Sequence, residues 1–210
     1  MTSEHKYKTE QEAFWAGEFG EEYIDRNEGA APVAANLALF SEILGRTRGI
    51  GSIIEFGANI GLNLRALHQL LPAAKLAAVE INPKAAEILR SLGYVDVQHR
   101  SILEYQPEDV YDLALIKGVL IHINPDQLPV VYDALYASSK RYVCVAEYYN
   151  PTPVSIPYHG HADRLFKRDF AGEMLDRFPD LRLIGYGFTY RRDPNFEHDD
   201  INWFLMEKNG

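Results

Sequence analysis

Apolar and polar positions follow two different periods along the chain, and from about residue 51 these alternate regularly. Short apolar runs are each followed by a stretch with apolar residues three and four positions apart, which is typical of strands alternating with helices. The predicted strands cover residues 52–56, 76–81, 95–97, 111–116 and 142–147, and the predicted helices cover 62–71, 84–92 and 124–138. Such serial units predict a parallel sheet with helices on both faces.

The C-terminal part departs from this alternation. Residues 148–161 hold several prolines and a glycine, which predicts a long loop, and such loops within a compact domain are usually functional. Residues 167–178 show a helical pattern, and two last strands, 181–190 and 201–207, are expected to form an antiparallel hairpin. The predicted fold class is α/β, with a Rossmann-like, mostly parallel sheet of seven strands and a C-terminal antiparallel hairpin.

Two helices are predicted before the sheet, over residues 11–27 and 32–44. The first carries the aromatic residues Phe14, Trp15, Phe19 and Tyr23. These side chains either pack the helix against the edge of the sheet or cover a bound ligand, and the pattern favours neither. We expect a helical cap formed by residues 1–48 and one compact α/β unit formed by residues 49–210.

Composition and charge narrow the class of protein. With 210 residues, 47% of them hydrophobic, the chain can bury one sizeable core. The formal net charge of -9 leaves no broad basic surface and argues against a nucleic-acid partner, although residues 164–168 form a local basic patch. The single cysteine, Cys144, lies in an apolar run and cannot form an internal disulfide. Residues 1–10 lack the apolar core of a signal peptide, and no apolar run could span a bilayer, so we expect a cytoplasmic protein with no membrane partner.

Candidate chemistry begins where the first strand turns into a helix, in the segment Glu55-Phe56-Gly57-Ala58-Asn59-Ile60-Gly61. A glycine there lets a ligand approach the backbone, asparagine tolerates a left-handed conformation, and the following helix N-terminus suits an anionic group. A dinucleotide-binding turn would place glycines at 57, 59 and 62, but two of these positions hold Asn59 and Leu62. The segment predicts a ligand-binding turn of another kind, with a purely structural turn as the alternative.

The ends of the second and third strands carry residues suited to a nucleoside. The second strand ends at Glu80 and Ile81, and a carboxylate there can accept hydrogen bonds from both ribose hydroxyls. A solvated charge at the end of the strand is the alternative. After the third strand, Ser101 and Ile102 offer one polar and one apolar side chain, which can flank a base.

The fourth strand ends at Lys117 and Gly118, and His122 follows in an apolar stretch. In open α/β sheets, ligands bind beyond the carboxyl ends of the strands, so this region is expected to border the reacting centre. A histidine among apolar residues is otherwise a buried core residue, and both interpretations of His122 stay open.

Several segments resemble one known family. They comprise residues 9–20, 23–27 and 54–64, followed by 115–126, 147–153, 167–176 and 199–207. In these segments, which extend over nearly the whole chain, the sequence resembles the pseudaminic acid biosynthesis-associated methylases, a group of class I S-adenosylmethionine (SAM)-dependent methyltransferases. The resemblance implies a class I methyltransferase fold and SAM as cofactor. The family's name comes from sugar-biosynthesis settings and does not define a substrate.

The resemblance also implies roles for individual residues. Together with the strand ends above, the cofactor would be held by Glu55, Gly57, Asn59, Gly61, Asn63, Glu80, Ile81, Ser101, Ile102, Lys117 and Gly118, and covered by Trp15, Tyr23, Arg26 and Asn27. Glu55 would orient the amino group of the cofactor. Arg26, as an alternative to covering the cofactor, could pair with the cofactor's carboxylate. An aromatic face near the sulfonium would gain cation–π attraction.

The predicted reaction is methyl transfer to a small-molecule acceptor such as a sugar or nucleotide sugar. Positioning supplies most of the catalysis of an in-line displacement, and a general base assists an acceptor that carries a proton. The candidate bases are His122, Glu147, His159 and His161, with a structural ion pair as the alternative for Glu147. We expect Tyr149 and Asn150 to face the substrate. No metal is expected, because the histidines lack a nearby cysteine or committed carboxylate.

Three other functions remain open. The same fold could use SAM itself as substrate, when its α-amine attacks the γ-carbon, releases methylthioadenosine and forms azetidine-2-carboxylate. A protein that binds SAM without catalysis is a second possibility. A nicotinamide-dependent dehydrogenase is the least expected, because Asn59 and Leu62 break the dinucleotide pattern.

Overall fold

The computed structural model describes residues 7–26, 29–158 and 161–209. Three helices precede the sheet: α1 (Glu10–Ala16), α2 (Glu18–Arg26) and α3 (Ala30–Leu44). The single helix predicted over 11–27 is thus two helices that separate at Gly17, whose backbone is extended. They pack tightly, because a Cβ atom on Gly20 would lie 1.9 Å from the backbone oxygen of Trp15.

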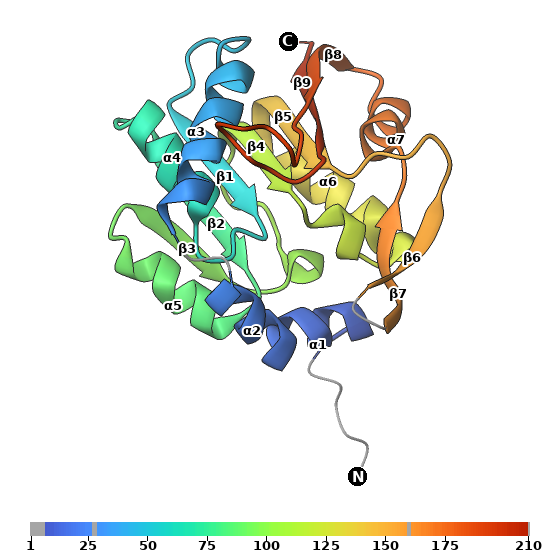
Figure 1. The fold of residues 1–210 in the computed structure, drawn as a ribbon. Coiled ribbons are helices and arrows are strands. Elements are labelled where there is room, and N and C mark those ends of the chain that lie inside the picture. Colours follow the sequence, from blue (N-terminus) through green and yellow to red (C-terminus); the bar gives the residue numbers. More distant parts are fainter. Residues whose placement is uncertain (1–6, 27–28, 159–160, 210) are drawn as a thin grey trace.

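The central sheet has seven strands in the order β3-β2-β1-β4-β5-β9-β8 (Figure 1). Its strands are β1 (Ser52–Phe56), β2 (Lys75–Glu80), β3 (Val95–His99), β4 (Tyr111–Lys117), β5 (Ser139–Glu147), β8 (Leu181–Phe188) and β9 (Asn202–Lys208). Strands β1 to β5 pair in parallel, whereas β9 runs antiparallel between β5 and β8. The predicted fold class is confirmed, including the C-terminal antiparallel hairpin.

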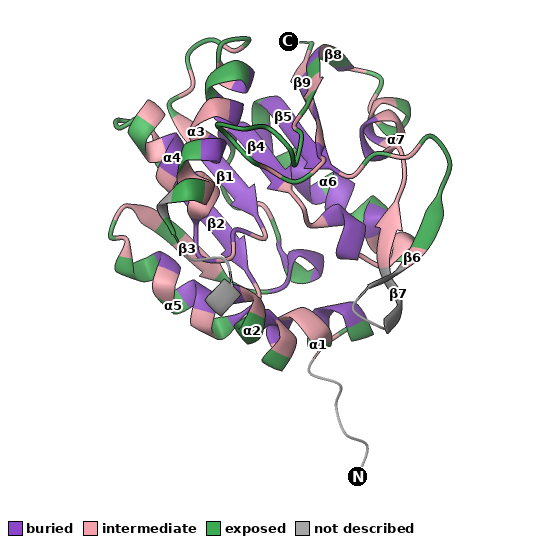
Figure 2. Ribbon diagram, viewed as in Figure 1, coloured by how far each residue is buried: buried purple, intermediate pink, exposed green. Residues whose placement is uncertain are grey.

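Helices cover both faces of the sheet, and each face has its own core. The remaining helices are α4 (Leu62–Leu70), α5 (Pro83–Ser91), α6 (Leu128–Ser138) and α7 (Phe170–Arg177), with short 3-10 turns η1 (Ile102–Glu104), η2 (Leu120–His122) and η3 (Pro125–Gln127). One core packs α3, α4 and α5 on the sheet, and the other packs α6 and α7. The central strands are therefore buried on both faces (Figure 2), as parallel strands usually are.

The segment expected to be a loop over 148–161 is organised differently. Strands β6 (Val154–Tyr158) and β7 (His161–Lys167) form a separate two-stranded antiparallel sheet. Prolines suggested a loop, but two-stranded edges tolerate proline because half of their N–H groups need no partner. The following helix begins later than predicted, since Asp169 caps it by accepting a 2.8 Å hydrogen bond from the Gly172 N–H. In the described part of the chain, no helix is long and apolar enough to cross a membrane.

Candidate functional site

A cavity of about 510 Å³ lies at the carboxyl ends of β1, β2 and β4. The glycine turn after β1 and the ends of β2 and β4 line one side, while α1, α2, the start of α3 and the loop between β8 and β9 line the other. Among the sequence-predicted residues, the cavity brings together Trp15, Tyr23, Gly57, Asn59, Asn63, Glu80, Ile81, Ser101, Ile102, Lys117, Gly118 and His122. Its position is the usual ligand site of an open α/β sheet.

The turn after β1 holds three residues in the left-handed region. These are Gly57, Asn59 and Gly61, with φ angles of 73°, 48° and 79°. A Cβ atom on Gly57 would lie 2.6 Å from the side chain of Val119, so glycine serves both the conformation and the close packing here. Gly61 is the N-cap of α4 and does not itself line the cavity.

Glu80, at the end of β2, is the best-defined polar group of the site. Its two carboxylate oxygens accept hydrogen bonds from the backbone N–H groups of Asn59 and Asn82, each at 2.7 Å. Burial raises the pKa of Glu80, and these two hydrogen bonds oppose the shift. Each oxygen keeps a further lone pair, so the carboxylate can also accept hydrogen bonds from a bound diol. Asn82 was not predicted, although a residue before Pro83 is a natural helix cap.

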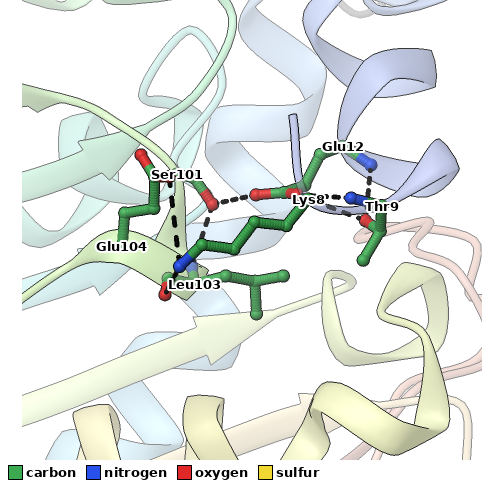
Figure 3. Close-up of polar contacts among 6 residues, drawn as sticks. All are labelled: Lys8, Thr9, Glu12, Ser101, Leu103 and Glu104. Carbon is green, nitrogen blue, oxygen red and sulfur yellow. Dashed lines mark hydrogen bonds and ion pairs between the residues drawn. The ribbon is translucent and has the colours of Figure 1, made fainter. Parts of the chain in front are cut away.

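The N-terminal segment is fastened to the turn after β3 (Figure 3). The hydroxyl of Ser101 donates a hydrogen bond to the carboxylate of Glu12 in α1 and accepts one from the Leu103 N–H at 3.0 Å. The ammonium of Lys8 donates to the backbone oxygen of Leu103 at 3.1 Å and lies 3.9 Å from Glu104. Sequence reasoning missed Glu12. Its spacing from Thr9 marks a capping box, which the structure contains, but gives no hint of a second partner so far along the chain.

Aromatic rings of α1 and α2 form one wall of the cavity. The indole of Trp15 lies 4.6 Å from the His122 ring and 5.3 Å from the Tyr23 ring, between centroids. The Asn82 side chain donates to the backbone oxygen of Trp15 at 3.2 Å, which ties this wall to the end of β2. His122 is buried and lines the cavity, and its role at a reacting centre stays a prediction.

Two ionisable groups, the buried Glu55 and the partly buried Lys117, lie in β1 and at the end of β4. The Asn63 side chain donates a 2.5 Å hydrogen bond to Glu55, whose other oxygen has no hydrogen-bond partner among the described residues. Burial raises the pKa of Glu55 to about 8, although the Asn63 hydrogen bond and the Lys117 charge act in the opposite direction. Burial likewise lowers the pKa of Lys117. Asn63 and Lys117 line the cavity, whereas Glu55 lies behind them.

Three of the predicted catalytic residues do not line the cavity. The carboxylate of Glu147 accepts 2.8 Å hydrogen bonds from the Val119 and Leu120 N–H groups, which shapes the turn after β4, and burial raises its pKa to about 7. Tyr149 is 40% exposed and contacts Phe204.

Asn150 is the third of these residues. Its side chain donates to the backbone oxygen of Thr152 at 2.5 Å, and its N–H donates to the backbone oxygen of Arg168. Tyr149 and Asn150 do not line this cavity, because after β5 the chain pairs with Arg168. That these two residues face the substrate stays a prediction.

Other predictions fall wholly or partly outside the described residues. Asn27 and His159 are not described, and neither are the side chains of Arg26 and His161. Within the described residues, no group of three or more histidine, cysteine or acidic side chains could hold a metal ion.

One cavity residue, His198, gave no signal in the sequence. It belongs to the loop between β8 and β9, and its Nε2 donates a 3.1 Å hydrogen bond to the side-chain oxygen of Asn36 in α3. Both residues line the cavity. They are 162 positions apart, so no local pattern could have joined them.

Comparison with known proteins places the fold. No protein-family model and no curated protein sequence matches the chain. A glycopeptide N-methyltransferase solved with SAM is 10% identical and has a TM-score of 0.64, with 84% of this chain and 94% of that one covered. The 1,6-didemethyltoxoflavin-N1-methyltransferase of Burkholderia thailandensis, solved with its substrate and S-adenosylhomocysteine (SAH), is 16% identical and has a TM-score of 0.68, with coverage of 95% and 87%.

A third solved structure is the magnesium protoporphyrin IX methyltransferase of Synechocystis PCC 6803 with bound SAH. It is 12% identical and has a TM-score of 0.69, with 94% of this chain and 97% of that one covered. The chain therefore has the class I SAM-dependent methyltransferase fold. At such low identity the likeness concerns the fold, and the finer resemblance to pseudaminic acid-associated methylases stays a prediction.

Proposed function

We propose that the chain is a SAM-dependent methyltransferase that acts on a small-molecule acceptor. The observation that carries this proposal is the convergence of the left-handed turn, the Glu80 carboxylate and the Trp15 wall on one cavity. These groups fit the cofactor, because a carboxylate suits a ribose diol and aromatic faces attract a cation. When bound, SAM supplies an electrophilic methyl group on a positively charged sulfur.

Each part of the cavity is assigned to one part of the cofactor. Glu80 accepts the ribose hydroxyls, while Ser101 and Ile102 flank the adenine. Asn63 and Lys117 lie at the end that receives the amino-acid moiety, where the Lys117 ammonium can pair with a carboxylate. The turn supports SAM over a nicotinamide dinucleotide, because Asn59 and Leu62 stand where a dinucleotide-binding turn needs glycines.

The cap role belongs to α1 and α2 in this proposal. These helices line the cavity and are tied to the rest of the chain through Glu12 and Asn82. By contrast, α3 packs Leu39, Phe40 and Ile43 into the core beside the sheet. Of the expected cap over residues 1–48, only the part before α3 can cover the cofactor without disturbing the core.

Product analysis tests the proposed function. The protein is incubated with SAM carrying a deuterated methyl group, together with nucleotide sugars, amino sugars and the small-molecule fraction of a bacterial extract. Mass spectrometry should find SAH and one labelled, methylated compound, both absent without protein. Binding of SAH with no labelled compound in any mixture would instead indicate a protein that binds the cofactor without transferring its methyl group.

A second candidate, cyclisation of SAM itself, is favoured by one observation. Lys117 lines the cavity, and burial lowers its pKa. The neutral amine, which can accept a proton, therefore forms more easily than on an exposed lysine. It could take a proton from the α-ammonium of SAM, whose freed amine would attack the γ-carbon and release methylthioadenosine. Incubation with SAM alone tests this candidate: methylthioadenosine with azetidine-2-carboxylate supports cyclisation, and unchanged SAM excludes it and leaves methyl transfer to the test with acceptors.

A further inference from the structure

We propose that Glu12 of α1 determines which base the cofactor site accepts. Its carboxylate accepts a hydrogen bond from the exocyclic amino group of adenine and excludes a base that carries an oxo group at that position. This inference rests on the proposed methyltransferase function, which places the adenine between Ser101 and Ile102. It starts from a carboxylate that α1 brings to the turn after β3, although the two segments are 89 positions apart in the sequence.

Ser101 has little hydrogen-bonding capacity left to recognise a base by itself. Glu12 and Ser101 are each only 7% exposed, so their polar atoms depend on partners in the protein or in a ligand. A hydroxyl has one proton and two lone pairs. The Ser101 hydroxyl donates its proton to Glu12 and accepts a hydrogen bond from the Leu103 N–H at 3.0 Å, which leaves one lone pair. Ser101 therefore acts mainly by holding the carboxylate.

The Glu12 carboxylate is held at both oxygens and can still accept a hydrogen bond from a ligand. Oε1 accepts one from the Ser101 hydroxyl, and Oε2 accepts one from the Thr9 N–H at 2.9 Å and one from the Thr9 hydroxyl at 3.4 Å (Figure 3). A carboxylate has about four lone-pair sites, so one remains, on Oε1. Thr9, Glu12 and Ser101 all line the cavity. The cavity wall thus carries a carboxylate that is already fixed in position.

The position of Glu12 matches the base end of the cofactor. Strands β3, β2, β1 and β4 are adjacent in that order, so the turn after β3 lies beside Glu80 at the end of β2. In the assignment above, the base, the ribose and the amino-acid moiety follow the same order. Glu12 contacts the turn after β3, whereas Trp15, one turn further along α1, contacts His122 after β4. The same face of α1 therefore extends from the base end of the site toward the amino-acid end.

The chemistry of a carboxylate selects the base. A carboxylate accepts hydrogen bonds and donates none, so it pairs with the amino group of adenine. Hypoxanthine has an oxygen in place of that amino group, and two acceptors would then face each other with no proton between them. A site built to hydrogen-bond an N–H group discriminates strongly against a ligand that lacks it, because the buried polar group of the site is left unpaired.

Glutamine is the informative replacement for Glu12, because Thr9 sets the orientation of the new amide. The Thr9 N–H needs an acceptor, so the amide oxygen takes the place of Oε2. The NH2 group then takes the place of Oε1, where it can donate to the oxo group of hypoxanthine. Glutamine also preserves the capping box at the start of α1, so the helix keeps its place.

The test compares the affinities of SAH and of its deaminated analogue, S-inosylhomocysteine, whose base is hypoxanthine, by titration calorimetry. Wild type should bind SAH at least roughly 100-fold more tightly than the analogue. Glu12→Gln should bind SAH roughly 10- to 150-fold more weakly than wild type does, and should bind the analogue at least as tightly as wild type does. The preference for SAH should therefore fall at least about tenfold.

Glu104→Gln is the matched control. Glu104 lies 3.9 Å from Lys8 beside the same turn but does not line the cavity, so this variant should keep the wild-type preference for SAH. A wild type that binds SAH without this preference would overturn the inference alone. So would a Glu12→Gln variant that binds both ligands more weakly by the same factor, because Glu12 would then have only a structural role. If wild type binds neither ligand, the proposed function fails, and the role of Glu12 falls with it.

Discussion

Replacing Glu80 by glutamine tests the part of the cavity whose hydrogen bonds are best defined. Both carboxylate oxygens of Glu80 accept a backbone N–H, from Asn59 and Asn82, at 2.7 Å. Glutamine offers one oxygen and one NH2 group, so one of these N–H groups would face another donor. An unsatisfied buried donor costs about 1–3 kcal/mol. In a protein of this size, each kcal/mol lowers the melting temperature by roughly 2–4 °C.

Cofactor affinity should fall in the same variant. A carboxylate can accept both ribose hydroxyls, and a hydrogen bond to a charged group is worth about 1.5–3 kcal/mol. Glu80→Gln should therefore bind SAH roughly 10- to 150-fold more weakly, as measured by titration calorimetry. Thermal unfolding of the same samples separates this loss of affinity from the loss of stability.

Asp112→Asn is the matched control for Glu80→Gln. The Asp112 carboxylate accepts a hydrogen bond from the Gly51 N–H at 2.8 Å and one from the Ser52 hydroxyl at 3.1 Å, at the amino ends of β1 and β4. Asp112→Asn should lower the melting temperature and leave SAH affinity unchanged. Equal SAH affinity in Glu80→Gln and wild type would refute the placement of a ribose at Glu80.

Three further predictions follow from other parts of the site. Gly57→Ala places an alanine at φ of 73° with its Cβ 2.6 Å from the Val119 side chain. The free energy of unfolding in urea should therefore fall by about 1–3 kcal/mol, and an unchanged unfolding midpoint would contradict this strain. Burial raises the pKa of Glu55 from 4.5 to about 8. Between these pH values the native state binds more protons than the unfolded state. The free energy of unfolding therefore falls as the pH rises, by up to about 1.4 kcal/mol per pH unit. Glu55→Gln should flatten this slope in urea unfolding at pH 5 to 8, and an identical slope in both proteins would argue against the shift. Ser101→Ala removes the hydrogen bond to Glu12 and should speed limited proteolysis of α1 about tenfold; identical digestion would show that this bond does not hold the helix.

The sequence predicted the parts of the fold that depend on local period. Strands such as 111–116 are buried on both faces, so their apolar runs were continuous and easy to place. The glycine turn could also be predicted from the sequence, because Gly57 and Gly61 lie between a strand and a helix. Local patterns failed at two points: the backbone becomes extended at Gly17 and divides the predicted helix, and the pairing of β6 with β7 overrides the prolines.

Most residues on the strand side of the cavity were predicted from the sequence, whereas on the opposite side only Trp15 and Tyr23 were predicted. The turn, Glu80, Ser101 and Lys117 each lie at or just after the end of a strand, and the rule that ligands bind at the carboxyl ends of strands places them together. Residues such as Glu12 and His198 reach the cavity from segments far away in sequence, and no spacing reveals such contacts. Tyr149 also follows a strand, but it pairs with Arg168 and does not line the cavity, which local sequence does not encode.

The most direct test of the central claim is a calorimetric titration of the wild-type protein with SAH, alongside a titration with NADH. We predict saturable binding of one SAH molecule per chain and no heat of binding with NADH. Binding of NADH without SAH would show that the cavity is a dinucleotide site, and the absence of binding to either ligand would contradict its assignment as a cofactor site.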